Sequence, residues 1–359
     1  MSVPFLRRFL LYFAGLMGAA ALVLLVAGGQ RPGQLDALQL LDAIVPWDLS
    51  SNTAAIVRMS DGSYSYLVNG NPQLFIGMGY NPIYRDLTPE ERAASYERDF
   101  RILCQAGVNH ITGWDYDKGY EQDHFDELTL DSANKYGLGV IMPFYLPPDG
   151  DYRDDGFTQG LMEQAAEKVS RFKNHPALRM WGVGNEVLTE MPRPMRRPFA
   201  RFYVRLADLF HEQDPNHPVI YREAEDLFAP MFNMVVEASD TLRPWLQYGM
   251  NVYSLELERI LDDWPSHSPE RPVFVTEFGA EAHWFGDRAL GYLAMWRTIR
   301  AHSSYVLGGA PYVWTTEGPE PVDEKWGLMD GNSEPVDDTF EQLAQDWRTE
   351  PGNQNRNCG

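Results

Sequence analysis

Two glutamates each end an apolar run, in "RMWGVGNE" (residues 179–186) and in "PVFVTEFG" (residues 272–279). A buried strand that ends in Asn185 and Glu186 places an amide and a carboxyl group where they can act on a ligand. Glu277 ends the second run in the same way. Cleavage of a glycosidic bond needs a proton for the leaving oxygen and a negative charge beside an oxocarbenium-like transition state, and two carboxyl groups in different environments supply both. We therefore interpret Glu186 and Glu277 as a catalytic pair that flanks a sugar.

The spacing of such a pair decides the reaction. Carboxyl groups about 5–5.5 Å apart allow one to attack the sugar while the other acts first as acid and then as base. This chemistry needs no cofactor and no metal. A metal-dependent hydrolase is disfavoured, because its site needs clustered histidines and carboxylates and the predicted strand ends carry no histidine pair.

Strand-like and helix-like segments alternate along the chain and would position these residues. A hairpin signal at Asn69-Gly70 comes first. Eight strands alternating with helices predict a parallel sheet, and over about 280 residues the economical closure is a barrel. An open doubly wound sheet is disfavoured, because "GMGYNP" after the first strand lacks the glycine spacing of a phosphate loop. The expected strands lie at 74–80, 108–114, 138–144, within 179–190, and at 218–223, 248–254, 272–278 and 306–314.

The predicted fold class is therefore α/β: a (β/α)8 TIM barrel with an N-terminal hairpin and an N-terminal transmembrane helix. Barrel enzymes carry their chemistry at the carboxyl ends of the strands. Besides the two glutamates, the residues expected to bind substrate there are Asn185, Tyr253, Trp314, Trp114, Asp115 and Asn251. Glu223 also ends a strand, and we interpret it as a rim or surface charge.

These motifs resemble those of the clan A glycoside hydrolases. "WGVGNE" is similar to the segment that carries the acid/base at the end of strand 4, and "PVFVTEFG" to the one that carries the nucleophile at the end of strand 7. "YLVNGNPQLFIGMGYNP" resembles the entry to the barrel in family 2 of that clan. "DFRILCQAGVNHITGW" resembles a passage found there and in the β-1,3-glucanosyltransferase-like families.

The resemblance implies a role for several residues. Glu186 would be the acid/base and Glu277 the nucleophile of a retaining β-glycosidase, or of a transglycosylase with the same mechanism. Asn185 would bind the sugar 2-hydroxyl, Tyr253 would hold the Glu277 carboxylate, and Trp314 would form the floor under the sugar. The implied substrate is a β-linked glycan or oligosaccharide.

The sequence departs from the clan pattern at the second strand. Many members have an arginine there, close to the nucleophile, whereas this chain has Thr112. Losing that cation would leave Glu277 with less to keep it ionised, unless Arg222 or another cation replaces it. The departure motivates a second hypothesis, a barrel that binds glycan without cleaving it in an envelope or polysaccharide-export complex. Because residues 31–63 are too few for the β-sandwich domains usual before a family 2 barrel, we assign only the clan.

The N-terminus indicates export. Arg7 and Arg8 precede an uncharged apolar run over residues 9–29. About 20 apolar residues can cross a bilayer, and the basic flank would keep the N-terminus in the cytoplasm. The length favours an uncleaved anchor in the cytoplasmic membrane over a cleaved signal peptide, whose apolar region is about 7–15 residues. We expect a membrane-anchored protein with its catalytic domain outside the cytoplasm, or a secreted one.

Charge and cysteine content narrow the remaining classes. The net charge of −21 argues against a nucleic-acid partner, because nothing would neutralise phosphates. The only cysteines, Cys104 and Cys358, predict neither a disulfide framework nor a cysteine metal site; Cys104 is interpreted as a small buried hydrophobe. The expected division of the chain is a membrane anchor or signal segment over 1–30, a linker over 31–63, the catalytic barrel over 64–347 and a polar tail over 348–359.

Overall fold

The computed structural model describes most of the chain beyond residue 51. Among these residues, no helix is long and apolar enough to cross a bilayer. The predicted anchor over 1–30 and most of the predicted linker lie outside them. The described residues are 52–84, 86–114, 125–225, 228–238, 243–267, 271–353 and 358.

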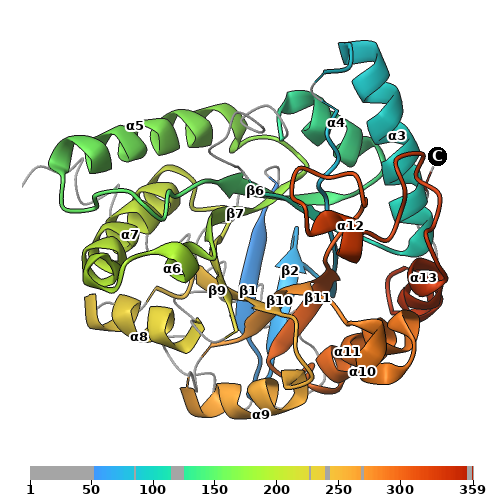
Figure 1. Ribbon diagram of the computed structural model, residues 1–359. Coiled ribbons are helices and arrows are strands. Elements are labelled where there is room, and N and C mark those ends of the chain that lie inside the picture. Colours follow the sequence, from blue (N-terminus) through green and yellow to red (C-terminus); the bar gives the residue numbers. More distant parts are fainter. Residues whose placement is uncertain are drawn as a thin grey trace, which may run out of the picture. The chain divides into compact units, whose positions relative to one another are not determined.

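Eight parallel strands close into a barrel, as the alternating pattern predicted (Figure 1). Around the ring the order is β10-β11-β4-β5-β6-β7-β8-β9. β7 and β10 are therefore three steps apart, so that the two glutamates approach the mouth from opposite sides. The barrel strands are β4 (Phe75–Gly79), β5 (His110–Thr112), β6 (Gly139–Phe144), β7 (Leu178–Asn185), β8 (Val219–Ala224), β9 (Leu246–Val252), β10 (Val273–Phe278) and β11 (Val306–Pro311).

Helices surround the strands, and the first of them begins and ends where the sequence indicates. The Thr88 side chain accepts a hydrogen bond from the Glu91 N–H, the Glu91 carboxylate accepts one from the Thr88 N–H, and Gly107 ends the helix in a left-handed conformation. The longer helices are α3 (Pro89–Ala106), α4 (Glu127–Lys135), α5 (Asp155–Phe172), α7 (Arg193–Gln213), α8 (Phe228–Ala238), α9 (Leu257–His267), α11 (Arg288–Ala301) and α13 (Thr339–Thr349), and the single turns are α6 (Val187–Glu190), α10 (Ala282–Phe285) and α12 (Asp323–Trp326).

A small antiparallel sheet covers the end of the barrel at which the strands begin. It consists of β1 (Ala54–Arg58), β2 (Tyr64–Val68) and β3 (Asn71–Pro72), with the predicted hairpin turn between the last two. Its side chains pack against residues from the starts of six barrel strands. β1 lies inside the segment expected as a linker. The apolar residues of β1 and β2 are thus an extension of the core, and they close the barrel opposite to the predicted site.

A disulfide joins Cys104 in α3 to Cys358 near the end of the chain. This finding overturns the expectation of no disulfide. Sequence spacing alone did not reveal the pairing, because 254 residues separate the two cysteines. They meet because α13 packs against α3 and the tail then returns to it, where Asn353 donates a hydrogen bond to the Gly107 carbonyl at 2.8 Å.

Candidate active site

A cavity of about 340 Å³ opens where β5, β7, β9, β10 and β11 end. A volume of this size suits a small ligand that is bound in a cleft. The wall carries both predicted glutamates together with an amide, several aromatic rings and one further carboxylate. Its lining residues are Trp114, Asn185, Glu186, Tyr253, Glu277, Tyr312, Glu320, Val322 and Trp326.

Glu277 lies within β10 and is buried, with 4% of its surface exposed. The Trp114 Nε1–H donates to one carboxylate oxygen at 2.8 Å, and the Tyr253 hydroxyl donates to the other at 2.6 Å. Two donors from different strands therefore fix the plane of the carboxylate. The predicted contact between Tyr253 and Glu277 is present, whereas the contact of Trp114 with the same carboxylate was not foreseen.

The charge on Glu277 is set by opposing effects. Burial and the nearby Glu186 carboxyl raise the pKa of Glu277 above its usual range. The hydrogen bond from Tyr253, the positive charge of Arg222 and the hydrogen bond from Trp114 all lower it. The ionised form that a nucleophile needs thus depends on these three neighbours.

Arg222 reaches the position where the clan pattern places an arginine, but from another strand. Its side chain starts on β8, is almost fully buried, and donates to the Thr112 hydroxyl and to the Gly113 carbonyl, both at 2.9 Å. A Cβ atom at Gly249 would lie only 2.9 Å from the Arg222 Cγ, and one at Gly182 would lie 3.4 Å from its Nη2. Two glycines and a small threonine thus leave room for the guanidinium inside the barrel.

Glu186 has a different setting. It follows β7 in a left-handed conformation, with φ of 49°, and it is only partly buried. The Asn251 side-chain amide donates to the Glu186 carboxylate at 2.9 Å and to the Asn185 amide oxygen at 3.2 Å. The Thr276 hydroxyl in turn donates to the Asn251 oxygen at 2.9 Å. Asn251 itself is buried and does not line the cavity, so its contacts position Asn185 and Glu186 instead of reaching a ligand.

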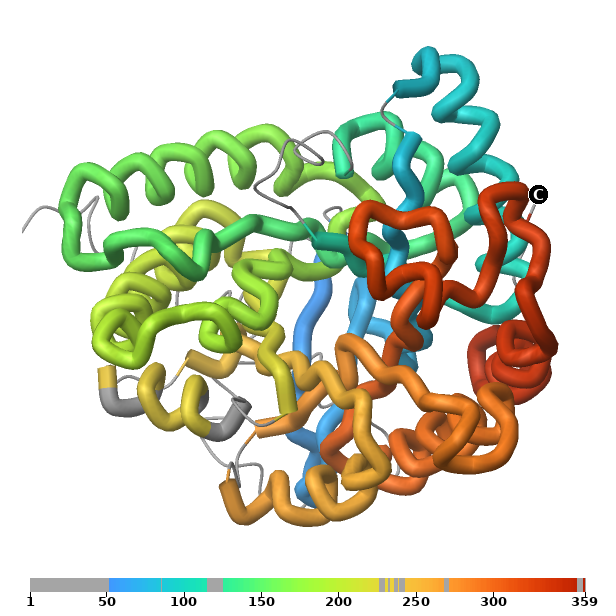
Figure 2. Tube along the Cα trace, viewed as in Figure 1, coloured from blue at the N-terminus to red at the C-terminus, as the bar shows by residue number. Residues whose placement is uncertain are grey.

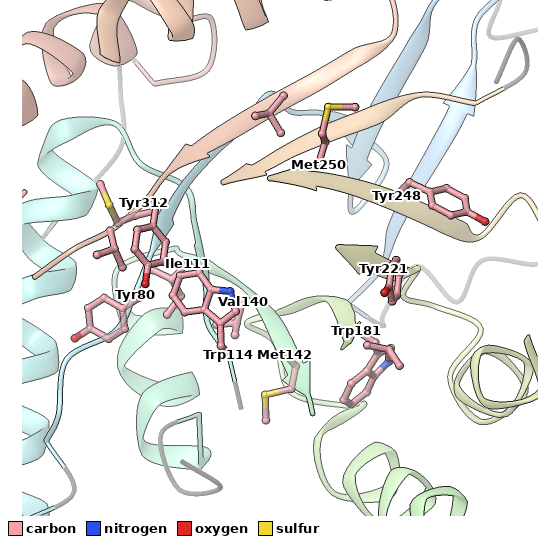
Figure 3. Close-up of a cluster of buried hydrophobic side chains, with 14 of the residues drawn as sticks. Tyr80, Ile111, Trp114, Val140, Met142, Trp181, Tyr221, Tyr248, Met250 and Tyr312 are labelled. Atoms are coloured by element: carbon pink, nitrogen blue, oxygen red, sulfur yellow. The ribbon is translucent and has the colours of Figure 1, made fainter. Parts of the chain in front are cut away.

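Four aromatic rings form a continuous wall beside the carboxylates. The ring of Tyr312 lies edge-on to Trp114, with centroids 5.3 Å apart (Figure 3), and edge-on to Tyr253 at 5.9 Å. Trp326 of α12 continues the wall at 5.3 Å from Tyr253. The Tyr312 hydroxyl donates to the buried Asp323 carboxylate at 2.6 Å, which links this wall to α12.

Over residues 95–309 the sequence matches the family described as "Glycosyl hydrolases family 2, TIM barrel domain". This is more than half of the chain. The chain belongs to glycosyl hydrolase family 2. The sequence had led us only to the clan, with family 2 as one of two alternatives, and the match decides between them.

Known proteins with this barrel include the β-glucuronidase of Canis lupus familiaris, which is 24% identical over 229 residues that cover 60% of this chain and 32% of that protein. The β-galactosidase of Psychromonas ingrahamii is 24% identical over 286 residues, covering 75% of this chain and 24% of its own length. The crystal structure of a Bacteroides uniformis β-glucuronidase superposes with a TM-score of 0.61 at 17% identity, covering 80% of this chain and 36% of that one. The chain thus spans about a third or less of the length of these relatives, and the structural likeness shows the fold.

The family 2 barrel does not bring every predicted residue to the cavity. Trp314 is fully buried, and its ring packs near Tyr80 and Phe340 instead of lining the cavity. β11 ends at Pro311, earlier than expected, so that Tyr312 takes the place at the wall that we had given to Trp314. Asp115 lies outside the described residues.

Other lining residues were missed because they lie beyond the last barrel strand. Glu320, Val322 and Trp326 belong to the segment that follows β11 and folds back beside it (Figure 2). The Met329 N–H bonds to the Trp314 carbonyl at 2.8 Å and holds this return. Within the described part of the chain, no cluster of three or more histidine, cysteine, aspartate or glutamate residues is arranged to hold a metal ion.

Proposed function

We propose that this barrel is a retaining β-glycosidase in which Glu277 is the nucleophile and Glu186 is the acid/base. The observation that carries the proposal is the contrast between the two carboxyl groups. Glu277 is buried and clamped by Trp114 and Tyr253, whereas Glu186 stands partly exposed at the opposite side of the same cavity. Environments that separate two carboxyl groups in this way are how one site provides both an acid and a nucleophile.

The reaction would proceed in two displacements. The Glu277 carboxylate attacks the anomeric carbon while the Glu186 carboxyl donates its proton to the departing glycosidic oxygen, so that a glycosyl ester forms on Glu277. Glu186, now ionised, takes a proton from water as the water oxygen attacks the anomeric carbon and Glu277 leaves. If a sugar hydroxyl replaces the water, the same ester gives transglycosylation.

The proposed substrate is a β-linked glycan or oligosaccharide. Several neighbours in this family are named β-glucuronidase or β-galactosidase, and the aromatic wall offers apolar faces on which a sugar ring can stack. Asn185, which lines the cavity beside Glu186, is proposed to bind the sugar 2-hydroxyl.

A turnover assay tests this function. The protein should hydrolyse aryl β-glycosides or β-glucan oligomers, the first product should keep the β configuration by NMR, and Glu277→Ala should abolish turnover. Inversion of the product would reject the two-displacement mechanism. Sugar binding without any turnover would favour the non-catalytic barrel, although the cation whose absence motivated that hypothesis is supplied by Arg222.

We also propose that the barrel works outside the cytoplasm, either anchored in the membrane by residues 9–29 or released after their cleavage. The Cys104–Cys358 disulfide supports this placement, because disulfides persist in oxidising compartments. Protease accessibility in intact cells or spheroplasts would test the placement, and N-terminal sequencing of the mature protein would tell an anchor from a cleaved signal. A fully cytoplasmic protein with both thiols reduced would contradict it.

A further inference from the structure

A third carboxyl group lies beneath the turn that carries Glu186. Glu223 is the next residue after Arg222 in β8, and it is fully buried. One carboxylate oxygen accepts hydrogen bonds from the Leu188 N–H at 3.1 Å and from the Tyr221 hydroxyl at 2.6 Å, and the other accepts from the Ala224 N–H at 3.0 Å. A buried carboxylate with this many donors holds the groups that it touches. The mechanism described above makes no use of it.

The turn after Glu186 needs such support. Glu186 adopts a left-handed conformation that residues other than glycine avoid. α6 is a single helical turn, which is too short to be stable without tertiary contacts. Two adjacent residues of β8 accept hydrogen bonds from this turn. The Arg222 carbonyl accepts from the Glu186 N–H at 3.0 Å, and the Glu223 carboxylate accepts from the Leu188 N–H.

The charge of Glu223 also bears on Glu186. Burial raises the pKa of Glu223 to about 7, the hydrogen bonds from Tyr221, Ala224 and Leu188 oppose this rise, and the Glu186 carboxyl adds to it. The influence is mutual, because two like charges each disfavour the ionised form of the other.

Neighbouring elements place one polar and one apolar residue beside Glu223. From α6 the Thr189 hydroxyl approaches at 3.5 Å, and on β9 the residue in register is Met250, which is apolar. Arg222 of β8 donates to the Thr112 hydroxyl, and Arg196 of α7 donates to the Leu188 carbonyl.

We propose that Glu223 is a positioning residue for Glu186, holding the acid/base turn through the Leu188 N–H and, where it is ionised, disfavouring the ionised form of Glu186. The inference rests on the proposed function, in which Glu186 must be protonated to act as an acid. Glu223 would thereby extend to higher pH the range over which Glu186 is protonated.

The test is Glu223→Gln, which keeps the size of the side chain, removes the charge and leaves one of its hydrogen-bond donors without an acceptor. The alkaline limb of the kcat/KM profile should move to lower pH by about 0.5–1 unit. At the optimum kcat should fall about 10-fold through misplacement of Glu186, with KM for an aryl β-glycoside little changed.

Asp214→Asn is the matched control. Asp214 is another buried carboxylate, at the opposite end of the barrel, where it accepts a hydrogen bond from Trp181 Nε1 at 2.8 Å and pairs with His217. This variant should lower the melting temperature without moving the alkaline limb. If Glu223→Gln behaves in the same way, with only stability affected, Glu223 is a structural brace and the inference is wrong.

A second variant covers the case in which Glu223→Gln does not fold. Tyr221→Phe leaves the carboxyl group in place but removes a hydrogen bond that favours its ionised form. The alkaline limb should then move in the same direction by a smaller amount, and an unmoved limb would overturn the inference. A wild-type protein without turnover on any aryl β-glycoside is a different result, seen before any substitution, and it rejects the proposed function and this inference with it.

Discussion

The two sides of the cavity give their carboxyl groups different environments. On the β10 side, Glu277 lies within a strand, is buried, and has one neutral donor on each oxygen, with the Arg222 charge nearby. On the β7 side, Glu186 lies beyond the strand in a left-handed turn, is partly exposed, and has the buried Glu223 carboxyl as a neighbour.

The proposed function uses this difference to give two roles to the same residue type. The donors and the cation around Glu277 lower its pKa, whereas burial and the Glu186 carboxyl raise this pKa above its usual range. On the other side, the Glu186 carboxyl raises the pKa of the buried Glu223. The proposed function makes Glu277 the nucleophile and Glu186 the acid, and the following experiments can break or sharpen that assignment.

Glu277→Gln should have the largest effect. Without a nucleophile no glycosyl ester forms, so turnover of an aryl β-glycoside should fall roughly 10⁴-fold or more. Glu320→Gln is the control, because Glu320 lines the same cavity but is exposed and lies on a loop. Retention of turnover within tenfold by the Glu277 variant would remove Glu277 from the mechanism.

Glu186→Ala should have the next largest effect, and its size should depend on the leaving group. Loss of the acid should cost about 10²–10⁴-fold for a glycoside whose leaving group needs a proton. The first step should be little affected for a dinitrophenyl glycoside, which leaves without one. Equal losses in the pre-steady-state burst for both glycosides would contradict the assignment of Glu186 as the acid.

Arg222→Met should shift the acid limb of kcat/KM to higher pH. The Arg222 charge lowers the pKa of Glu277, so that its loss raises this pKa and a higher pH is needed to ionise the nucleophile. We expect a loss of activity of about 10-fold or more below neutral pH. Adding Thr112→Arg to this variant should restore part of the activity, because Arg222 contacts Thr112 in the native protein. An arginine at position 112 would therefore place its positive charge in the same part of the barrel. An acid limb that does not move in the single variant would show that Arg222 has no such role.

The disulfide should matter least for turnover. Replacing Cys104 and Cys358 together by serine should lower the free energy of unfolding by about 2–5 kcal/mol, measured as a lower melting temperature. Because neither cysteine lines the cavity, kcat and its pH profile at 25 °C should stay the same. A changed pH profile would mean that the tail influences the site.

The sequence predicted most of the barrel because periodicity is a local property. All eight barrel strands overlap the segments expected from the sequence, and α3 begins and ends at its capping residues. α8 was missed, since its sequence is strongly apolar and has few polar residues to mark a helix. β1 was missed because it lies in a short segment of mixed polarity. Its apolar residues become buried only by packing against the end of the barrel.

In the site, the lining residues that directly follow apolar runs were predicted. The lining residues in the segment after β11 were not. Glu186, Glu277, Asn185, Tyr253 and Trp114 line the cavity as expected. The exchange of Trp314 for Tyr312 followed from a strand that ends a few residues early. Glu223 was taken for a rim or surface charge, because the residues next to it in the sequence do not indicate that α6 covers it.

By itself the sequence determined which residue types stand at the ends of the strands, and hence the kind of chemistry that the mouth of the barrel can perform. Only the tertiary structure decided which of them touch. Arg222 meets Thr112, Glu223 meets Leu188, and Cys104 meets Cys358 across 110, 35 and 254 positions respectively. Such contacts depend on ring closure and on the register of parallel strands, which are properties of the whole barrel and not of any one segment.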